Sequence, residues 1–315
     1  MISIYVADTK DRQPRPKEFA SRAKRLLEFW GDMTLAQVTG QTCREYVEKG
    51  GTRRQLEDLR AAIGHHLAEG LHREIVKVVL PEKGIPRQRW LTRSEAARLV
   101  WSAWRYREIQ KGKATDRYSR RHVARFILVG LYTGTRAGAI CSAAFKPTDG
   151  CGWIDLETGV FYRRPEGERE TNKRKAPVRL PSRLLDHLRR WKAKRACFNH
   201  PVEWIGEPVR DVDKAFRNSV KAAGLPPDVT PHVLKHTAIT WAMQEGMSKE
   251  DAAKFFSTTV ETIERHYWHH HPDFQKEAAE RMNRRSRQKP DRNERNKREQ
   301  NGTERDNVLV LKRAS

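Results

Sequence analysis

Apolar positions recur at helical spacing along most of the chain. Between residues 16 and 69 they recur every three or four residues, which predicts a small unit of short amphipathic helices. The same spacing predicts later helices over residues 92–107 and 119–132, with further helices starting at residues 182 and 212. Alternation with period two is confined to residues 153–162 and 176–180, which predicts a hairpin and a third strand. The expected fold class is mainly α with a small antiparallel β-sheet.

Composition divides this pattern into five segments. Residues 81–91 contain two prolines and a glycine among several cations, so we expect a linker there. Residues 1–15 are polar and predict a flexible lead-in, and residues 16–80 predict a small all-helical domain. Residues 92–282 predict a second, larger domain. Residues 283–315 are rich in Arg, Asn, Lys and Glu, and predict a basic tail that is disordered in isolation.

The most informative stretch covers residues 230–272. Thr230 and Pro231 are typical of a helix start. His232, Lys235 and His236 follow at spacings of three and four residues, so they project from nearly one helix face. Two shorter helical segments come next, and the second carries Tyr267 near its end. The stretch therefore brings imidazoles, an ammonium group and a phenol onto consecutive short helices.

Charge narrows the class of partner. The chain has 315 residues and a formal net charge of +23, which favours a polyanion and, first of all, double-stranded DNA. An anionic membrane surface is the competing partner, but no apolar run approaches the ~20 residues that a membrane span needs. The four cysteines lack C-x-x-C spacing, which argues against a zinc site and suits reduced thiols in a cytosol; they are Cys43, Cys141, Cys151 and Cys197. We expect no cofactor and no metal.

Four short motifs in a fixed order point to one family. The sequence Thr133-Gly134-Thr135-Arg136 comes first, a basic segment over residues 170–181 follows, and His232-Val-Leu-Lys235-His236-Thr237 precedes Tyr267. This arrangement resembles the catalytic half of the tyrosine recombinases, the phage-integrase family. No single motif is specific, but together and in order they make coincidence improbable. The resemblance implies that residues 16–80 form a helical DNA-binding domain and that residues 92–282 form a catalytic domain.

The resemblance also implies roles for individual residues. Tyr267 would attack DNA and remain joined to the 3′ phosphate, while Arg136 would hold that phosphate. Lys173, on the tip of the hairpin, would give a proton to the leaving 5′ oxygen, with Lys175 as the alternative. His232 would assist proton transfer beside the tyrosine.

Two departures from the family pattern bear on activity. Lys235 stands where the family has its second arginine, which keeps the charge but loses a bidentate grip. Thr258 stands where the family has histidine or tryptophan, and Ser257 precedes it in place of glycine. Thr258 would either donate one hydrogen bond to phosphate or, as we favour, cap the next helix. The implied activity is site-specific DNA recombination by a weakened site; the alternative is a protein of the same fold that only binds DNA.

The remaining implications concern partners and place. The resemblance implies attachment-type DNA sites, a homo-tetramer on two synapsed duplexes, viral genome integration, and work in the cytoplasm of a bacterial host at its nucleoid. A histidine run, His266 with His269, His270 and His271, has spacing that would also suit a metal. We favour its interpretation as cations facing the negative end of a helix.

Overall fold

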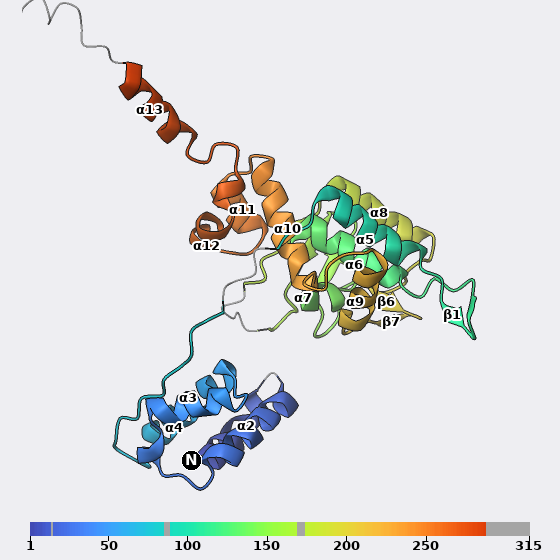
Figure 1. The fold of residues 1–315 in the computed structure, drawn as a ribbon. Coiled ribbons are helices and arrows are strands. Elements are labelled where there is room, and N and C mark those ends of the chain that lie inside the picture. Colours follow the sequence, from blue (N-terminus) through green and yellow to red (C-terminus); the bar gives the residue numbers. More distant parts are fainter. Residues whose placement is uncertain (14, 85–88, 169–173, 288–315) are drawn as a thin grey trace, which may run out of the picture. The chain divides into compact units, whose positions relative to one another are not determined.

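The computed structural model describes residues 1–13, 15–84, 89–168 and 174–287 (Figure 1). The chain separates into two compact units, Met1–Arg87 and Gln88–Ser315, each with its own hydrophobic core. The division falls inside the segment 81–91 that we expected to be a linker. Within the described ranges, no helix is long and apolar enough to cross a bilayer.

The smaller unit is built from short helices. They are α1 (Ile2–Thr9), η1 (Lys10–Arg12), α2 (Pro16–Trp30), η2 (Leu35–Gln37), α3 (Gly40–Glu48) and α4 (Arg53–Ala68). Local chemistry marks their starts: the Thr39 and Thr52 hydroxyls each accept a hydrogen bond from the backbone three residues on. Leu26, Leu56 and Leu59 then fill the centre with almost no exposed surface.

The expectation of a loose lead-in at residues 1–15 was wrong for its first part. Ile2–Thr9 is helix α1, which packs against α2 and α4 and buries Ile2 in the core. The imidazole of His65 also lies 2.9 Å from the Asp8 carboxylate. Two helical turns are too short to be stable alone, so this helix depends on tertiary packing that local sequence does not reveal.

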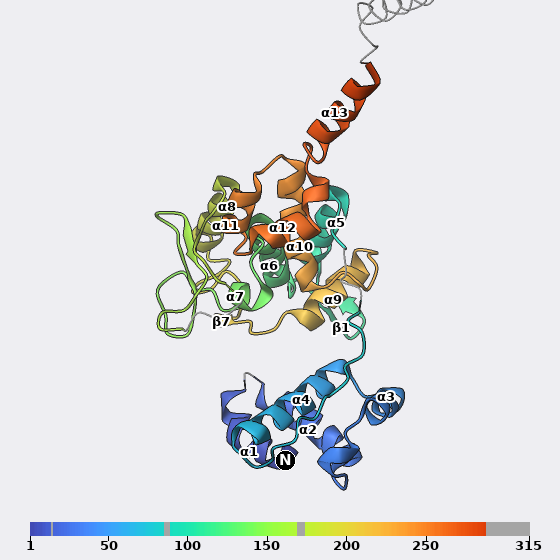
Figure 2. The same cartoon turned by 90° about the vertical axis from the view of Figure 1, so that its left-hand side faces the viewer.

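The larger unit combines helices with three small antiparallel sheets (Figures 1 and 2). Its helices are α5 (Arg93–Arg105), α6 (Arg121–Thr133), α7 (Ala137–Cys141), α8 (Ser182–Ala193), α9 (Asp213–Ala222), α10 (Pro231–Gln244), α11 (Lys249–Phe255), α12 (Val260–His266), η3 (Trp268–His270) and α13 (Lys276–Arg287). Its strands are β1 (Ile109–Gln110), β2 (Lys113–Ala114), β3 (Trp153–Asp155), β4 (Val160–Tyr162), β5 (Val178–Arg179), β6 (Glu203–Trp204) and β7 (Glu207–Pro208). The expected fold class, mainly α with small antiparallel sheets, is confirmed.

Helix α6 lies at the centre of this unit, packed against both α5 and α10. Val123, Phe126 and Ile127 on α6 are completely buried. Gly130 permits a close approach of α10, because a Cβ there would lie 2.9 Å from a methyl carbon of Leu234. The packing therefore holds the end of α6 beside the start of α10.

The three-stranded sheet β3-β4-β5 confirms the predicted hairpin and third strand. Ile154 pairs with Phe161 across the hairpin, and Phe161 pairs with Val178 on β5. All three side chains are buried, so their shared face fixes the register. Between β4 and β5 runs the segment on which the sequence placed Lys173.

The C-terminal elements continue farther than expected. A helical segment to about residue 282 and a tail over 283–315 were predicted, and α13 instead extends to Arg287. Residues 288–315 lie outside the described part of the chain.

Candidate functional site

Arg136 is held at a sharp change of chain direction after α6. Gly134 ends α6 in the left-handed region, with φ of +57°. A Cβ at this position would lie only 2.4 Å from the Phe256 ring, so both the backbone angle and the space require glycine. Arg136 is the residue immediately before α7. Its Nη1 donates to the backbone oxygen of Arg174 at 2.9 Å. Burial lowers the pKa of Arg136, which remains a cation at neutral pH.

Helix α10 presents the predicted cation and imidazoles from one face. His232 lies exposed in its first turn, and its ring meets the His236 ring edge-on at 4.7 Å between centroids. Partial desolvation, followed by the charges of Lys235 and Arg136, lowers the pKa of His232. The end of α6 lies against this helix, because a Cβ on Gly134 would be 3.5 Å from the Cβ of Ala238.

Lys235 is buried, with 8% of its surface exposed. Its Nζ donates to the backbone oxygen of Phe256 at 2.9 Å. Burial, with the positive charges of Arg136 and Arg163, lowers the pKa of Lys235 to about 7. Within the described ranges no carboxylate forms an ion pair with Lys235, Arg136 or Arg163, so no ion pair neutralises the positive charges that act on Lys235.

Tyr267 lies directly after α12 and points back to α10. Its hydroxyl is 2.6 Å from Nδ1 of His236. The ring is 6% exposed and packs in a hydrophobic cluster with Ile239 and Ile263. Burial raises the pKa of Tyr267 to about 12. Burial, then the charges of His232, Lys235 and His266, lowers the pKa of His236 to about 4, so the imidazole is neutral at physiological pH.

The expected helix-capping role of Thr258 was wrong. Helix α12 is capped by Thr259, whose hydroxyl accepts from the backbone of Thr262 at 3.2 Å. Thr258 instead lies half-buried in the turn between α11 and α12, with its N–H bonded to the Ala253 carbonyl. Ser257 before it has φ of +49°, the left-handed region that a glycine adopts at little cost. Ser257 therefore holds a backbone conformation that a glycine at this position would adopt more easily.

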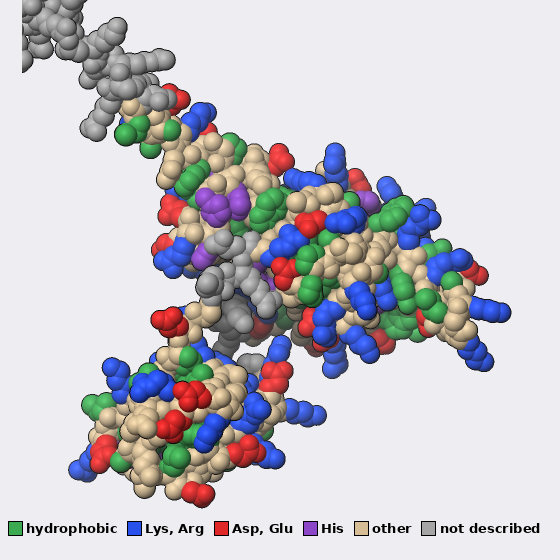
Figure 3. Space-filling model, viewed as in Figure 1, with side chains coloured by type: hydrophobic (Ala, Val, Ile, Leu, Met, Phe, Trp, Pro, Cys, Tyr) green, Lys and Arg blue, Asp and Glu red, His purple; other side chains and the backbone are tan. Residues whose placement is uncertain are grey.

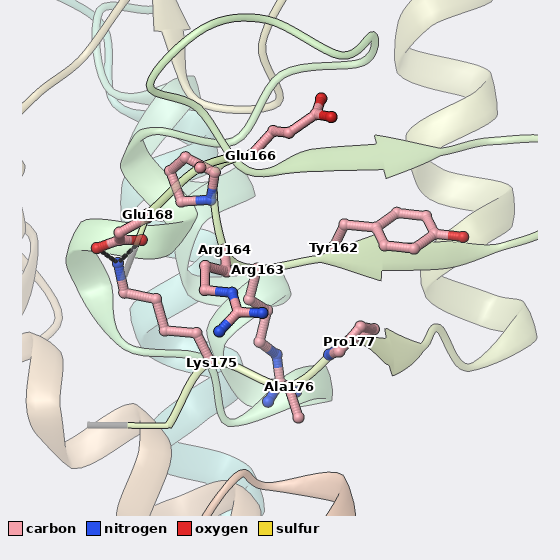
Figure 4. A pocket seen from close by; sticks show the side chains of 10 residues that line it. Tyr162, Arg163, Arg164, Glu166, Glu168, Lys175, Ala176 and Pro177 are labelled. Atoms are coloured by element: carbon pink, nitrogen blue, oxygen red, sulfur yellow. Dashed lines mark hydrogen bonds and ion pairs between the residues drawn. The ribbon is translucent and has the colours of Figure 1, made fainter. Parts of the chain in front are cut away.

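Lys173 and Lys175 were predicted as alternatives for the acid that protonates the leaving oxygen. Lys173 lies outside the described residues. Lys175 forms an ion pair with Glu168 at 2.5 Å, and both side chains line a pocket at the base of the hairpin arm (Figure 4). Lys175 is therefore already engaged by a carboxylate.

The histidine run after α12 packs locally. His271 stacks on Trp268 with ring centroids 4.2 Å apart, and His269 lies against His270. No three His, Cys, Asp or Glu side chains of the described ranges are grouped to hold a metal ion.

Two residues near these groups were missed as site residues by sequence reasoning. His236 had a usable signal, because it lies four residues from His232 on the same helix face. Arg163 also had one, since a period of two puts it on the face of Phe161, which is buried. The structure places its guanidinium against the carbonyls of Thr133 and Phe255.

Comparison with solved structures supports the fold. A structure of the Tn1549 transposon integrase in complex with transposon right end DNA matches with a TM-score of 0.63 and 17% identity. That match covers 89% of this chain and 98% of the other chain. A lambda integrase dimer bound to a COC′ core site matches with a TM-score of 0.58 and 16% identity, over 83% of this chain and 95% of the other. A search of curated proteins gave no match.

The family model gives a direct assignment. The phage integrase family model matches residues 89–273, which is more than half of the chain. The match spans all the segments that carry Arg136, Lys235 and Tyr267. The chain therefore belongs to the phage integrase family, that is, to the tyrosine recombinases.

Proposed function

We propose that this protein is a site-specific DNA recombinase that cuts and rejoins DNA through a bond between Tyr267 and a 3′ phosphate. One observation carries the proposal: the Tyr267 hydroxyl lies 2.6 Å from His236, on the helix that also presents His232 and Lys235. The phenol, the imidazoles and the ammonium group thus share one small region. Family membership and the DNA complexes of similar integrases support DNA as the substrate.

The cations of this region suit a phosphodiester. Arg136 has a planar guanidinium that matches two non-bridging oxygens, and Lys235 adds a second positive charge. Neither is neutralised by a carboxylate among the described residues. A buried cation without a counter-ion is unfavourable, so an incoming phosphate would be bound strongly. The surface of the larger unit, where Lys and Arg side chains are widespread, would attract the DNA backbone (Figure 3).

The chemical step balances without an external energy source. The Tyr267 oxygen forms a bond to phosphorus while the bond from phosphorus to the 5′ oxygen breaks. Lys173 donates a proton to the departing 5′ oxygen. Because Lys175 already pairs with Glu168, Lys173 remains our choice for this acid. A 5′ hydroxyl from another strand then reverses the step and releases the tyrosine.

Proton transfer at the tyrosine is assigned to His236, with His232 behind it. A phenol with a pKa of about 12 keeps its proton beside an imidazole with a pKa of about 4. The hydrogen bond therefore orients Tyr267 without activating it. Bound phosphate, with Arg136 and Lys235, must stabilise the developing negative charge before His236 takes the proton. This couples cutting to correct binding of DNA.

A second candidate function is DNA binding without cutting. It is favoured by the burial of Tyr267, 6% exposed within a hydrophobic cluster, and by the lysine and threonine at positions 235 and 258. If each altered contact weakens transition-state binding, activity falls about tenfold to a hundredfold per change. We place cutting first because the phenol faces an imidazole.

The wider assembly follows from this reaction. Exchange between two duplexes requires four active sites, so we propose a homo-tetramer on attachment-type sites. Integration of a viral genome within a bacterial host cytoplasm is the setting that fits such an activity.

The deciding experiment uses a nicked suicide DNA carrying an attachment site. We expect a covalent protein–DNA adduct that is lost in Tyr267→Phe, which retains the ring and removes the attacking oxygen. The matched control is Tyr162→Phe on strand β4, which should still form the adduct. Normal DNA affinity with no adduct from the wild type would instead support binding without cutting.

A further inference from the structure

Arg163, at the end of strand β4, is a buried cation outside the set of residues that perform the proposed chemistry. Only 3% of its surface is exposed. Burial, with the charge of Arg136, lowers its pKa to about 10, so it stays charged at neutral pH. Its Nε has no hydrogen-bond partner among the described residues. Burial of a charged group is costly, so the presence of this arginine in the core requires an explanation.

The guanidinium of Arg163 joins two segments of the site directly. Its Nη2 donates to the Thr133 carbonyl at 3.0 Å, one residue before Gly134. The same nitrogen donates to the Phe255 carbonyl at 3.0 Å, and Nη1 donates to the Ser257 hydroxyl at 2.9 Å. The end of α6 and the turn after α11 are thereby held to one rigid, planar group.

The same turn collects two further contacts. Lys235 donates to the Phe256 carbonyl, and the backbone N–H of Ala176 donates to the Ser257 hydroxyl at 3.0 Å. Ala176 belongs to residues 174–177, the hairpin arm, which connects Lys173 to strand β5. Figure 4 shows Arg163 extending from β4 toward Ala176. Three consecutive residues, 255–257, thus receive hydrogen bonds from strand β4, helix α10 and the hairpin arm.

We propose that Arg163 is a positioning residue of the recombination reaction. Its guanidinium sets the relative positions of the Arg136 loop, the turn beneath Lys235 and the arm that leads to Lys173. The proposal rests on the function proposed above for this site. We place Arg163 behind the phosphate contact, because only 3% of its surface is exposed and its terminal nitrogens donate to protein oxygens.

The charge of Arg163 has a second, separable effect. The groups that act on or lie beside Lys235 are Arg136 immediately before α7, Arg163 immediately after β4, and His232 and His236 on α10. Removing the positive charge of Arg163 raises the pKa of Lys235. Since protonated Lys235 is the form that binds phosphate, adduct formation should then persist to higher pH.

The chain offers a matched control in Arg125. This arginine is also buried, 4% exposed, and also donates to backbone carbonyls, at Ala196, Pro201 and Glu203. Burial likewise lowers its pKa. None of these three carbonyls belongs to the site. Substitution of either arginine should therefore lower the stability of the fold. Only substitution of Arg163 should disturb the relative positions of the site segments.

The experiment compares Arg163→Lys and Arg163→Met with Arg125→Lys and Arg125→Met in the full chain. Measurements are thermal unfolding, the rate of adduct formation on suicide DNA from pH 5.5 to 9, and hydrogen exchange of the Ala176 amide in the free protein. We expect Arg163→Lys to slow adduct formation by about tenfold to a hundredfold, since a single ammonium nitrogen cannot reproduce the planar guanidinium that reaches acceptors on separate segments from two nitrogens. Arg163→Met should also shift the pH of half-maximal rate upward.

The controls decide the outcome. Arg125 variants with a similar loss of thermal stability should keep the adduct rate within about twofold and leave the pH profile in place. Ala176 should lose exchange protection in the Arg163 variants only. Equal rate losses for both arginines, or a wild-type rate of adduct formation in Arg163→Lys, would overturn the proposal. If the wild type forms no adduct, the proposed function fails, and Ala176 exchange alone still decides whether Arg163 holds the arm.

Discussion

The two units treat their buried charge in opposite ways. In the smaller unit Arg22 donates to Asp58 at 2.6 Å, and that carboxylate is 7% exposed. In the larger unit Arg136, Arg163 and Lys235 act on one another, and no carboxylate of the described ranges pairs with any of them. One unit neutralises its cation internally, as ordinary stability requires. The other keeps positive charge that only an external anion would balance, which is what a phosphate-binding site needs.

Substitution of Arg136, which removes one of these cations, should cause the largest loss of adduct formation. We expect Arg136→Gln to slow adduct formation by about 10²–10³-fold, because the charge that stabilises the transition-state oxygens is lost. Quench-flow or gel analysis of adduct formation measures it. Arg189→Gln, an exposed arginine on α8 that donates to the Leu156 carbonyl, removes the same charge elsewhere and should change the rate less than about threefold. Similar rates for both variants would contradict the role of Arg136.

Altering Lys235 should have an intermediate effect that depends on pH. Its pKa of about 7 is below the ordinary value, so phosphate binding weakens as pH rises through 7. Lys235→Arg remains charged throughout and should remove that fall in adduct rate between pH 6 and 8. Lys235→Met should form the adduct about tenfold to a hundredfold more slowly than the wild type at pH 6. A wild-type pH profile in Lys235→Arg would show that another group titrates.

The same lysine gives a stability prediction of known sign. Between pH 7 and about 10 the unfolded chain holds a proton on Lys235 that the folded chain has lost, so stability rises with pH. Comparing the pH dependence of unfolding in the wild type and Lys235→Met isolates this contribution. A difference that falls with pH would contradict the burial of a neutral lysine.

Breaking the pair in the smaller unit should have the smallest effect on chemistry. Asp58→Asn leaves Arg22 without its charge partner and should cost about 2 kcal/mol in the free energy of unfolding. Glu57→Gln on the same helix removes a more exposed carboxylate, paired with Arg53, and should cost about 0.5 kcal/mol. Denaturant titration measures both. Equal costs would mean that the Arg22 pair is not specially stabilised.

Much of this organisation was readable from the sequence. Periods of three to four and of two placed the helices and the sheet correctly, because both depend on which face is buried. The family was also correct, since the Arg136, His232 and Tyr267 segments lie in order. Helix α1 was missed because its stability comes from packing against α4, which no local pattern contains.

The site was readable only in part. The spacing of His232, Lys235 and His236 predicted a shared face, as the structure has it. It did not predict that Tyr267 would face His236, because that contact depends on the turn between α11 and α12. The capping residue was misplaced by one position for the same reason. The role of Arg163 depends on carbonyls from two other segments, and these come together only in the folded chain.

One measurement tests the central claim most directly: the pKa of Lys235, followed by NMR of its Nζ with and without DNA. The account predicts that the pKa rises from about 7 when a duplex with a charged phosphate at the cutting position binds. It should rise much less when that phosphate is replaced by a neutral methylphosphonate. An equal pKa in all three states would contradict the claim that these cations hold the DNA phosphate.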